Sequence, residues 1–151
     1  MPAAISVSFT YWLILFTMMS IRGGRLLLAL YALELDAAPF TVGLIAATFS
    51  ALPMLLSLIA GKASDRFGPR WPLFLGLLGA TLGMLVPFFF RSVPALFVAA
   101  VMNGFAFTFY SVSLQNTVGL LSAPQTRVKN FANLGLVASV GQFFAPLIIG
   151  F

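Results

Sequence analysis

The sequence predicts an all-α membrane protein with five transmembrane helices, and three observations support this prediction. Hydrophobic residues make up 61% of the 151 residues, and charged residues make up only 7%, whereas a soluble domain has about 25% charged residues. Several apolar runs reach the roughly 20 residues that a helix needs to cross a bilayer. Short segments with charged residues, glycine or proline separate these runs. So little charge cannot cover a water-exposed surface, and the lipid bilayer is therefore an expected partner.

The composition also argues against several classes of function. The chain contains neither Cys nor His, which removes disulfides, thiol nucleophiles, imidazole bases and the usual zinc ligands. The sequence shows no acid–base pair, nucleophile triad or phosphate loop, so we expect no enzyme activity, metal site or cofactor. The net charge of +5 comes from basic residues scattered singly near helix ends, which argues against nucleic-acid binding.

The first helix is predicted over residues 8–33, about 39 Å at 1.5 Å per residue. The tetrad Arg22-Gly23-Gly24-Arg25 lies inside this range. If the helix ended before the tetrad, the apolar piece 26–33 would be too short to cross the membrane before Glu34. One long helix, weakened or kinked at the two glycines, is therefore the preferred interpretation.

This interpretation places Arg22 and Arg25 inside the membrane. The two residues share a face because residues three apart are neighbours on a helix. An arginine at the centre of a span costs about 2.5–3.5 kcal/mol on insertion scales, so this face should look into a bundle interior or a wet cavity. Two interpretations stay open: a cationic patch for an anionic substrate or a buried carboxylate, and a structural pair that caps backbone carbonyls or reaches the interface.

Four further helices are predicted between short polar or proline-containing connections. Their ranges are 41–60, 71–90, 95–117 and 130–151. Pro53 is expected to kink the second helix. Gly76, Gly79 and Gly83 share one face of the third helix and are expected to let a neighbouring helix approach closely. The fourth helix contains Asn103, which either bonds across helices or lines a cavity.

The basic residues predict how the chain is oriented. Loops alternate between the two sides of the membrane. One side, 61–70 and 122–130, contains the basic residues Lys62, Arg66, Arg70, Arg127 and Lys129. The other side, 34–39 and 91–94, contains only Arg91 as a basic residue, together with Glu34 and Asp36. The excess of basic residues places the first side, and with it the N-terminus, in the cytoplasm.

The segment from Gly61 to Arg70 resembles the signature loop between the second and third helices of major facilitator superfamily (MFS) transporters. The pattern is Gly, three residues, Asp-Arg, one residue, Gly and then basic positions. Here it consists of Gly61, Asp65, Arg66, Gly68 and Arg70, with Pro69 where the family often has a basic residue. In family members the matching Asp contacts the partner half when the cytoplasmic side is closed. The resemblance therefore implies a conformational latch at Asp65, with Arg66 and Arg70 as local partners. The alternative is a topology anchor.

A weaker resemblance lies in the fifth helix. Gly141, Ala145, Pro146 and Gly150 are similar to the proline-glycine motif of drug–proton antiporters in the same superfamily, although Ala145 stands in place of a usual Gly. The similarity implies close helix packing here, and it implies an exporter. The fourth helix departs from the proton-coupled pattern, because Ala100 stands where such members often have Arg. Arg22 could supply the missing charge.

The resemblance also implies an architecture. Family members usually have twelve helices in two six-helix halves, with the substrate near the midplane between the halves. Residues 1–151 look like a partial N-terminal transmembrane domain, most of one six-helix half, with the rest of the transporter absent. The partners implied are the bilayer, a small-molecule substrate and the missing C-terminal half.

The implied function is secondary active transport of a small molecule by alternating access, with export favoured. A proton or other ion gradient would drive it. The candidate substrate or coupling residues are Arg22, Arg25 and Asn103, and the two arginines favour an anionic substrate. The expected location is the cell membrane, as a multi-pass protein. Two alternatives stay open: a membrane scaffold or sensor that does not transport, and an inactive truncated transporter fragment.

Overall fold

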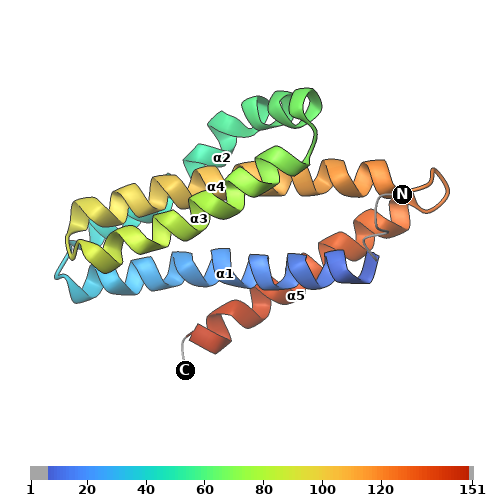
Figure 1. The fold of residues 1–151 in the computed structure, drawn as a ribbon. Coiled ribbons are helices and arrows are strands. Elements are labelled where there is room, and N and C mark those ends of the chain that lie inside the picture. Colours follow the sequence, from blue (N-terminus) through green and yellow to red (C-terminus); the bar gives the residue numbers. More distant parts are fainter. Residues whose placement is uncertain (1–6, 150–151) are drawn as a thin grey trace.

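The computed structural model describes residues 7–149, which fold into five α-helices (Figure 1). The helices are α1 (Val7–Glu34), α2 (Pro39–Phe67), α3 (Arg70–Phe89), α4 (Val93–Leu121) and α5 (Arg127–Ile149). Helices α2 to α5 are each long and apolar enough to cross a membrane. Helix α1, with 28 residues, matches them in length. The predicted all-α membrane fold is thereby confirmed.

Helix α1 runs without a break through Gly23 and Gly24. It ends in a turn where Asp36 adopts a left-handed conformation with φ of 54°. The Ala37 N–H donates to the carbonyl oxygen of Ala32 at 3.0 Å, which satisfies one of the carbonyls left open at the helix end. One continuous helix therefore contains both arginines, as the length argument from the sequence requires.

The structure corrects the predicted end of the second helix. The sequence interpretation ended this helix at residue 60 and placed 61–70 in a loop, whereas α2 continues to Phe67. The connection to α3 consists of Gly68, with φ of 77°, and Pro69. Only glycine adopts this φ readily, so the chain turns at Gly68. Charged residues mark where an apolar span ends, but they do not end a helix, and α2 extends about two turns beyond the span.

The fourth and fifth helices also extend beyond their predicted ranges. Helix α4 runs over Val93–Leu121 instead of 95–117, and α5 begins at Arg127 instead of residue 130. The charged residues Arg127 and Lys129 lie in the first turn of α5, whereas α4 gains a last turn of apolar residues, 118–121. The remaining connection is held by a side-chain bond, since Arg127 Nη2 donates to the carbonyl oxygen of Gly119 at 2.9 Å. The α4–α5 turn is therefore short and tied to the end of α4.

Helix α4 forms the centre of the bundle. Helices α3 and α2 pack on α4 most extensively, whereas α1 packs mainly on α5 (Figure 1). The apolar span of α4 is 56% buried, against 11% for those of α2 and α5. The outer faces are strongly apolar, as Met54, Leu55 and Leu58 on α2 show by being exposed. Such faces are suited to contact with lipid.

Glycines on α3 let α3 and α4 approach closely. A Cβ atom at Gly76 would lie 2.9 Å from the carbonyl oxygen of Ala106 and 3.1 Å from the amide nitrogen of Tyr110. A Cβ atom at Gly83 would lie 2.9 Å from Cβ of Met102. At Gly79 the nearest atom would be 3.6 Å away, an ordinary contact. Because lipid removes the hydrophobic driving force between helices, helices in a bilayer associate through close backbone packing of this kind.

A pair of matched substitutions tests this contact. We expect Gly76→Ala to destabilise the protein by about 1–3 kcal/mol, because the new methyl group meets α4 backbone that cannot move aside cheaply. Gly79→Ala makes the same chemical change where there is room, and alanine favours a helix over glycine by about 0.8–1 kcal/mol. Thermal unfolding of the purified protein in detergent should therefore separate the two variants. Equal melting temperatures would contradict the close approach.

Candidate functional site

The arginine pair of α1 faces α2 and α4. The guanidinium carbon of Arg22 lies 5.6 Å from the ring centre of Phe107 in α4. The guanidinium carbon of Arg25 lies 5.9 Å from the ring centre of Phe49 in α2. Both arginines are half-buried. An aromatic face attracts a cation and replaces part of the hydration that the cation loses in an apolar site.

The two arginines differ in their hydrogen bonds. Arg25 Nη2 donates to the carbonyl oxygen of Ala46 at 3.2 Å and to Ser50 Oγ at 3.4 Å. The Arg22 Nε atom is buried and has no hydrogen-bond partner among the described residues. Arg25 is therefore anchored to α2, whereas Arg22 keeps an unmet donor.

No acidic residue of the chain lies near this arginine pair in the sequence. The chain has three acidic residues, Glu34, Asp36 and Asp65, and each lies at or next to a helix end. Glu34 is nearest along α1, nine residues beyond Arg25, which is about 14 Å along the helix. The charges of the pair are therefore held inside the bundle by aromatic rings, a backbone carbonyl and a hydroxyl.

Two cavities border the arginine pair. The smaller, of about 40 Å³, is lined by Ile21, Arg22, Arg25, Phe49 and Phe107. The larger, of about 220 Å³, is lined by Arg22, Arg25, Leu26, Ala29, Ile45, Ala46 and Phe49. Apart from the two guanidinium groups, every lining side chain is aliphatic or aromatic. The site is thus an apolar space with a cationic wall.

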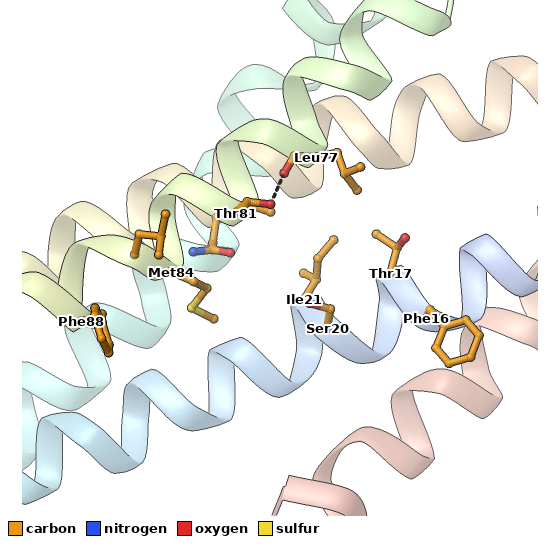
Figure 2. Close-up of a pocket in the computed structure, with 11 residues that line it drawn as sticks. Phe16, Thr17, Ser20, Ile21, Leu77, Thr81, Met84 and Phe88 are labelled. Atoms are coloured by element: carbon orange, nitrogen blue, oxygen red, sulfur yellow. Dashed lines mark hydrogen bonds between the residues drawn. The ribbon is translucent and has the colours of Figure 1, made fainter.

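Asn103 lines a different cavity, of about 540 Å³, between α1 and α3. Figure 2 shows Thr17 and Ile21 of α1 on one side of this cavity, and Leu77 and Thr81 of α3 on the other. Asn103 is 2% exposed, and its Nδ2 donates to the carbonyl oxygen of Ala99 in the same helix at 2.9 Å. The three predicted site residues therefore do not border one cavity, because Asn103 belongs to the α1–α3 side.

The signature segment is tied to α4 by a polar contact. Asn116 Nδ2 of α4 donates to Ser64 Oγ at 2.9 Å and more weakly to Asp65 Oδ1 at 3.5 Å. Ser64 is 1% exposed, whereas Asp65 is exposed at the end of α2. The Arg66 guanidinium lies over the Phe67 ring at 5.4 Å, and Arg70 begins α3. Asp65 is thus positioned from α4.

Sequence reasoning missed the roles of Ser64 and Asn116. Neither residue is charged, and 52 positions separate them. The signal in the sequence is weak: both are polar residues near the C-terminal end of an apolar run, in helices that run in the same direction across the membrane. Only the packing of α2 against α4 shows that they meet.

The motif of the fifth helix lies partly against α1. A Cβ atom at Gly141 would lie 3.3 Å from Cβ of Met18 and 3.4 Å from the carbonyl oxygen of Leu15. Ala145, one turn later, is buried, and Pro146 is exposed. Gly150, the last residue of the predicted motif, lies outside the described residues. Helix α5 therefore approaches α1 through its small residues.

A bundle of long apolar helices with two arginines inside it and charged residues at the helix ends defines a multi-pass membrane protein. The sequence pattern of the Major Facilitator Superfamily matches residues 3–151. The chain belongs to this superfamily.

Two curated relatives share this similarity. The tetracycline resistance protein, class B, of Escherichia coli is 32% identical over 109 residues, which cover 72% of this chain and 27% of that protein. Multidrug resistance protein 1 of Bacillus subtilis (strain 168) is 26% identical over 118 residues, covering 78% of this chain and 30% of that protein. The aligned part of the chain thus spans less than a third of the length of either relative.

The contact between α2 and α4 can be tested at two neighbouring amides. We expect Asn116→Ala to destabilise the protein by about 1 kcal/mol, because it leaves the buried Ser64 hydroxyl without its donor. Gln115→Ala is the matched control, since Gln115 is exposed and its side chain donates a hydrogen bond to Ser111 of its own helix. Thermal unfolding in detergent measures both. A melting temperature for Asn116→Ala as high as that of the control would argue against the contact.

Proposed function

We propose that this chain is part of the N-terminal half of a secondary transporter that exports a small molecule by alternating access. The observation that carries the proposal is the family's signature segment, with its aspartate positioned from α4 by Asn116. The names of the two relatives, resistance to tetracycline and to multiple drugs, support export of a small organic molecule. We propose a proton or other ion gradient as the energy source.

The position of Asp65 supports a role as a conformational latch. Its carboxylate is exposed at the end of α2, and its contact to Asn116 is long and involves a neutral donor. The charge is therefore available to a group outside the described helices. A carboxylate that accepts hydrogen bonds from the N-terminal N–H groups of an opposing helix makes a charge-assisted contact of about 1.5–3 kcal/mol, to which the helix dipole adds about 0.3–1 kcal/mol. Such a contact with the second half would hold the cytoplasmic side closed, and its loss would let the halves rock.

The helix contacts also indicate which side of α1 meets the substrate. Each six-helix half of this family is built from two inverted three-helix repeats, so that α1 corresponds to α4 and α2 to α5. The α1–α5 contact then matches the α4–α2 contact. The extensive α3–α4 contact would match a contact between α1 and a sixth helix.

A sixth helix in that position would occupy the groove between α1 and α3. This groove contains the cavity lined by Asn103 and a second cavity, of about 480 Å³, lined in part by Glu34 and Arg91. The arginine pair lies on the α2–α4 side instead. We therefore propose that Arg22 and Arg25 face the substrate path, and that Asn103 supports packing.

We propose that the protein resides in the cell membrane with its N-terminus and the α2–α3 connection in the cytoplasm. The basic residues at that end of the bundle outnumber those at the other end, as positive-inside topology requires.

Substitution of the aspartate tests the latch. In the full-length protein, we expect Asp65→Asn to slow export from energised membrane vesicles by about tenfold or more. The reason is that loss of a charge-assisted contact of about 1.5–3 kcal/mol shifts the conformational equilibrium by that factor. Asp36→Asn, in the opposite connection, is the control and should keep the wild-type rate. Wild-type export by Asp65→Asn would exclude the latch, and absence of export by the unaltered protein would favour a scaffold that does not transport.

The orientation can be measured with single cysteines, because this chain has none. We expect Asp36→Cys to react with a membrane-impermeant maleimide on intact cells. Lys62→Cys should react only after the cells are permeabilised, since its side of the bundle faces the cytoplasm. The reverse labelling pattern would overturn the proposed topology.

A further inference from the structure

We propose that Arg22 and Arg25 form the anion-binding end of a site for an aromatic monocarboxylate within the membrane span. The inference rests on the proposed function in one respect: it takes the occupant of this site to be the transported solute. The hydrogen bonds, charges and cavities around the pair support the site itself.

The positive charge of the arginine pair is not balanced by a nearby acidic residue along α1. Two cations three residues apart lie inside an apolar bundle, and every acidic residue of the chain is at or next to a helix end. Buried charges in membrane proteins pair with another charge, bind backbone carbonyls or face a wet cavity. Arg25 follows the second course, through Ala46. Arg22 borders both cavities, and its buried Nε has no partner among the described residues.

The guanidinium group of Arg22 has the geometry to bind a carboxylate. A guanidinium group binds a carboxylate in a bidentate manner through two parallel N–H donors. Arg22 borders both cavities, so its two terminal N–H groups supply such an edge, whereas its unmet Nε–H is buried behind them. Arg25 is anchored to Ala46 and Ser50 of α2, so it supplies a second positive charge at a defined position. The pair is therefore suited to a single carboxylate bound by Arg22 beside Arg25.

The space beside the two arginines has the size and the lining for an aromatic ring. The larger cavity, about 220 Å³, is lined by aliphatic side chains and by the ring of Phe49. Phe107 lies beside Arg22 in the smaller cavity. For comparison, an engineered apolar cavity of about 150 Å³ binds benzene. A phosphate dianion would need further polar donors that this lining lacks, whereas a benzoate-sized molecule matches its apolar body and single charge.

Two measurements on the full-length protein in detergent test the proposal, with benzoate as the probe. The first is stabilisation against heat by benzoate, by its neutral isostere benzamide and by inorganic phosphate at equal concentrations. The second is the melting temperature without any ligand. Both are made on the wild type, Arg22→Gln, Arg22→Lys and the control Arg91→Gln, which changes an exposed arginine in the α3–α4 connection.

We expect benzoate to stabilise the wild type and Arg91→Gln, and benzamide and phosphate to have little effect. Arg22→Gln should weaken benzoate binding about tenfold or more, because it removes a charge-assisted, bidentate contact. Arg22→Lys should restore part of the affinity, since it keeps the charge but loses the fork. Without ligand, Arg22→Gln should melt at the same temperature as the wild type or higher, because an uncompensated charge has been removed.

The contrary results are equally definite. Equal stabilisation by benzoate and benzamide, or unchanged benzoate affinity in Arg22→Gln, would overturn the proposal. A lower melting temperature or a failure of Arg22→Gln to fold would overturn it too, because Arg22 would then be paired with a carboxylate elsewhere in the full protein. Preferential binding of phosphate would assign the pair to a different anion. None of these measurements requires transport, so the vesicle assay tests the proposed export function separately.

Discussion

Lipid offers no hydrogen-bond partner to the peptide backbone, so each N–H and C=O group inside the bilayer must be satisfied within the chain. The arrangement of this protein depends on that constraint. The described residues meet this constraint by forming five long helices joined by short turns. Because the helices satisfy their own backbones, only side chains remain to define how they pack. The few polar side chains within the bundle then acquire a disproportionate influence on its structure.

Packing in this bundle is achieved through small residues on α3 and α5. Gly76 and Gly83 bring α3 onto the backbone of α4, and Gly141 brings α5 onto α1. Between these two close pairs lies a looser boundary along α1, and all four cavities described above have α1 residues in their lining. The tight contacts therefore join α3 to α4 and α5 to α1, and α1 also provides the surfaces where another helix or a solute can be accommodated.

The polar residues divide between two tasks. At the end of α2, Ser64 and Asn116 join two helices and position the exposed Asp65. In the middle of α1, Arg25 is anchored to the backbone of α2, and Arg22 is left with an unmet donor. A polar group that is satisfied within the bundle supports the structure, whereas an unsatisfied group that borders a cavity, as Arg22 does, lacks a partner of its own. The proposed solute site therefore includes Arg22 and not Asn103, whose amide donates to the carbonyl oxygen of Ala99.

The sequence by itself determined the class of fold, the number of helices and the family, because hydropathy and motif spacing are local properties. It also predicted that one long helix, weakened or kinked at Gly23-Gly24, contains both arginines, since a shorter helix could not cross a bilayer. It misplaced the end of α2, because polarity marks the end of an apolar span and not the end of a helix. Only the tertiary structure decided that Asn116 meets Ser64, that Arg25 bonds to Ala46, and that Asn103 lies on the other side of α1. The first two contacts join residues 21 or more positions apart in the sequence, and the position of Asn103 depends on how α4 is rotated about its axis. Packing between helices sets such long-range contacts and rotations, and no local sequence pattern encodes that packing.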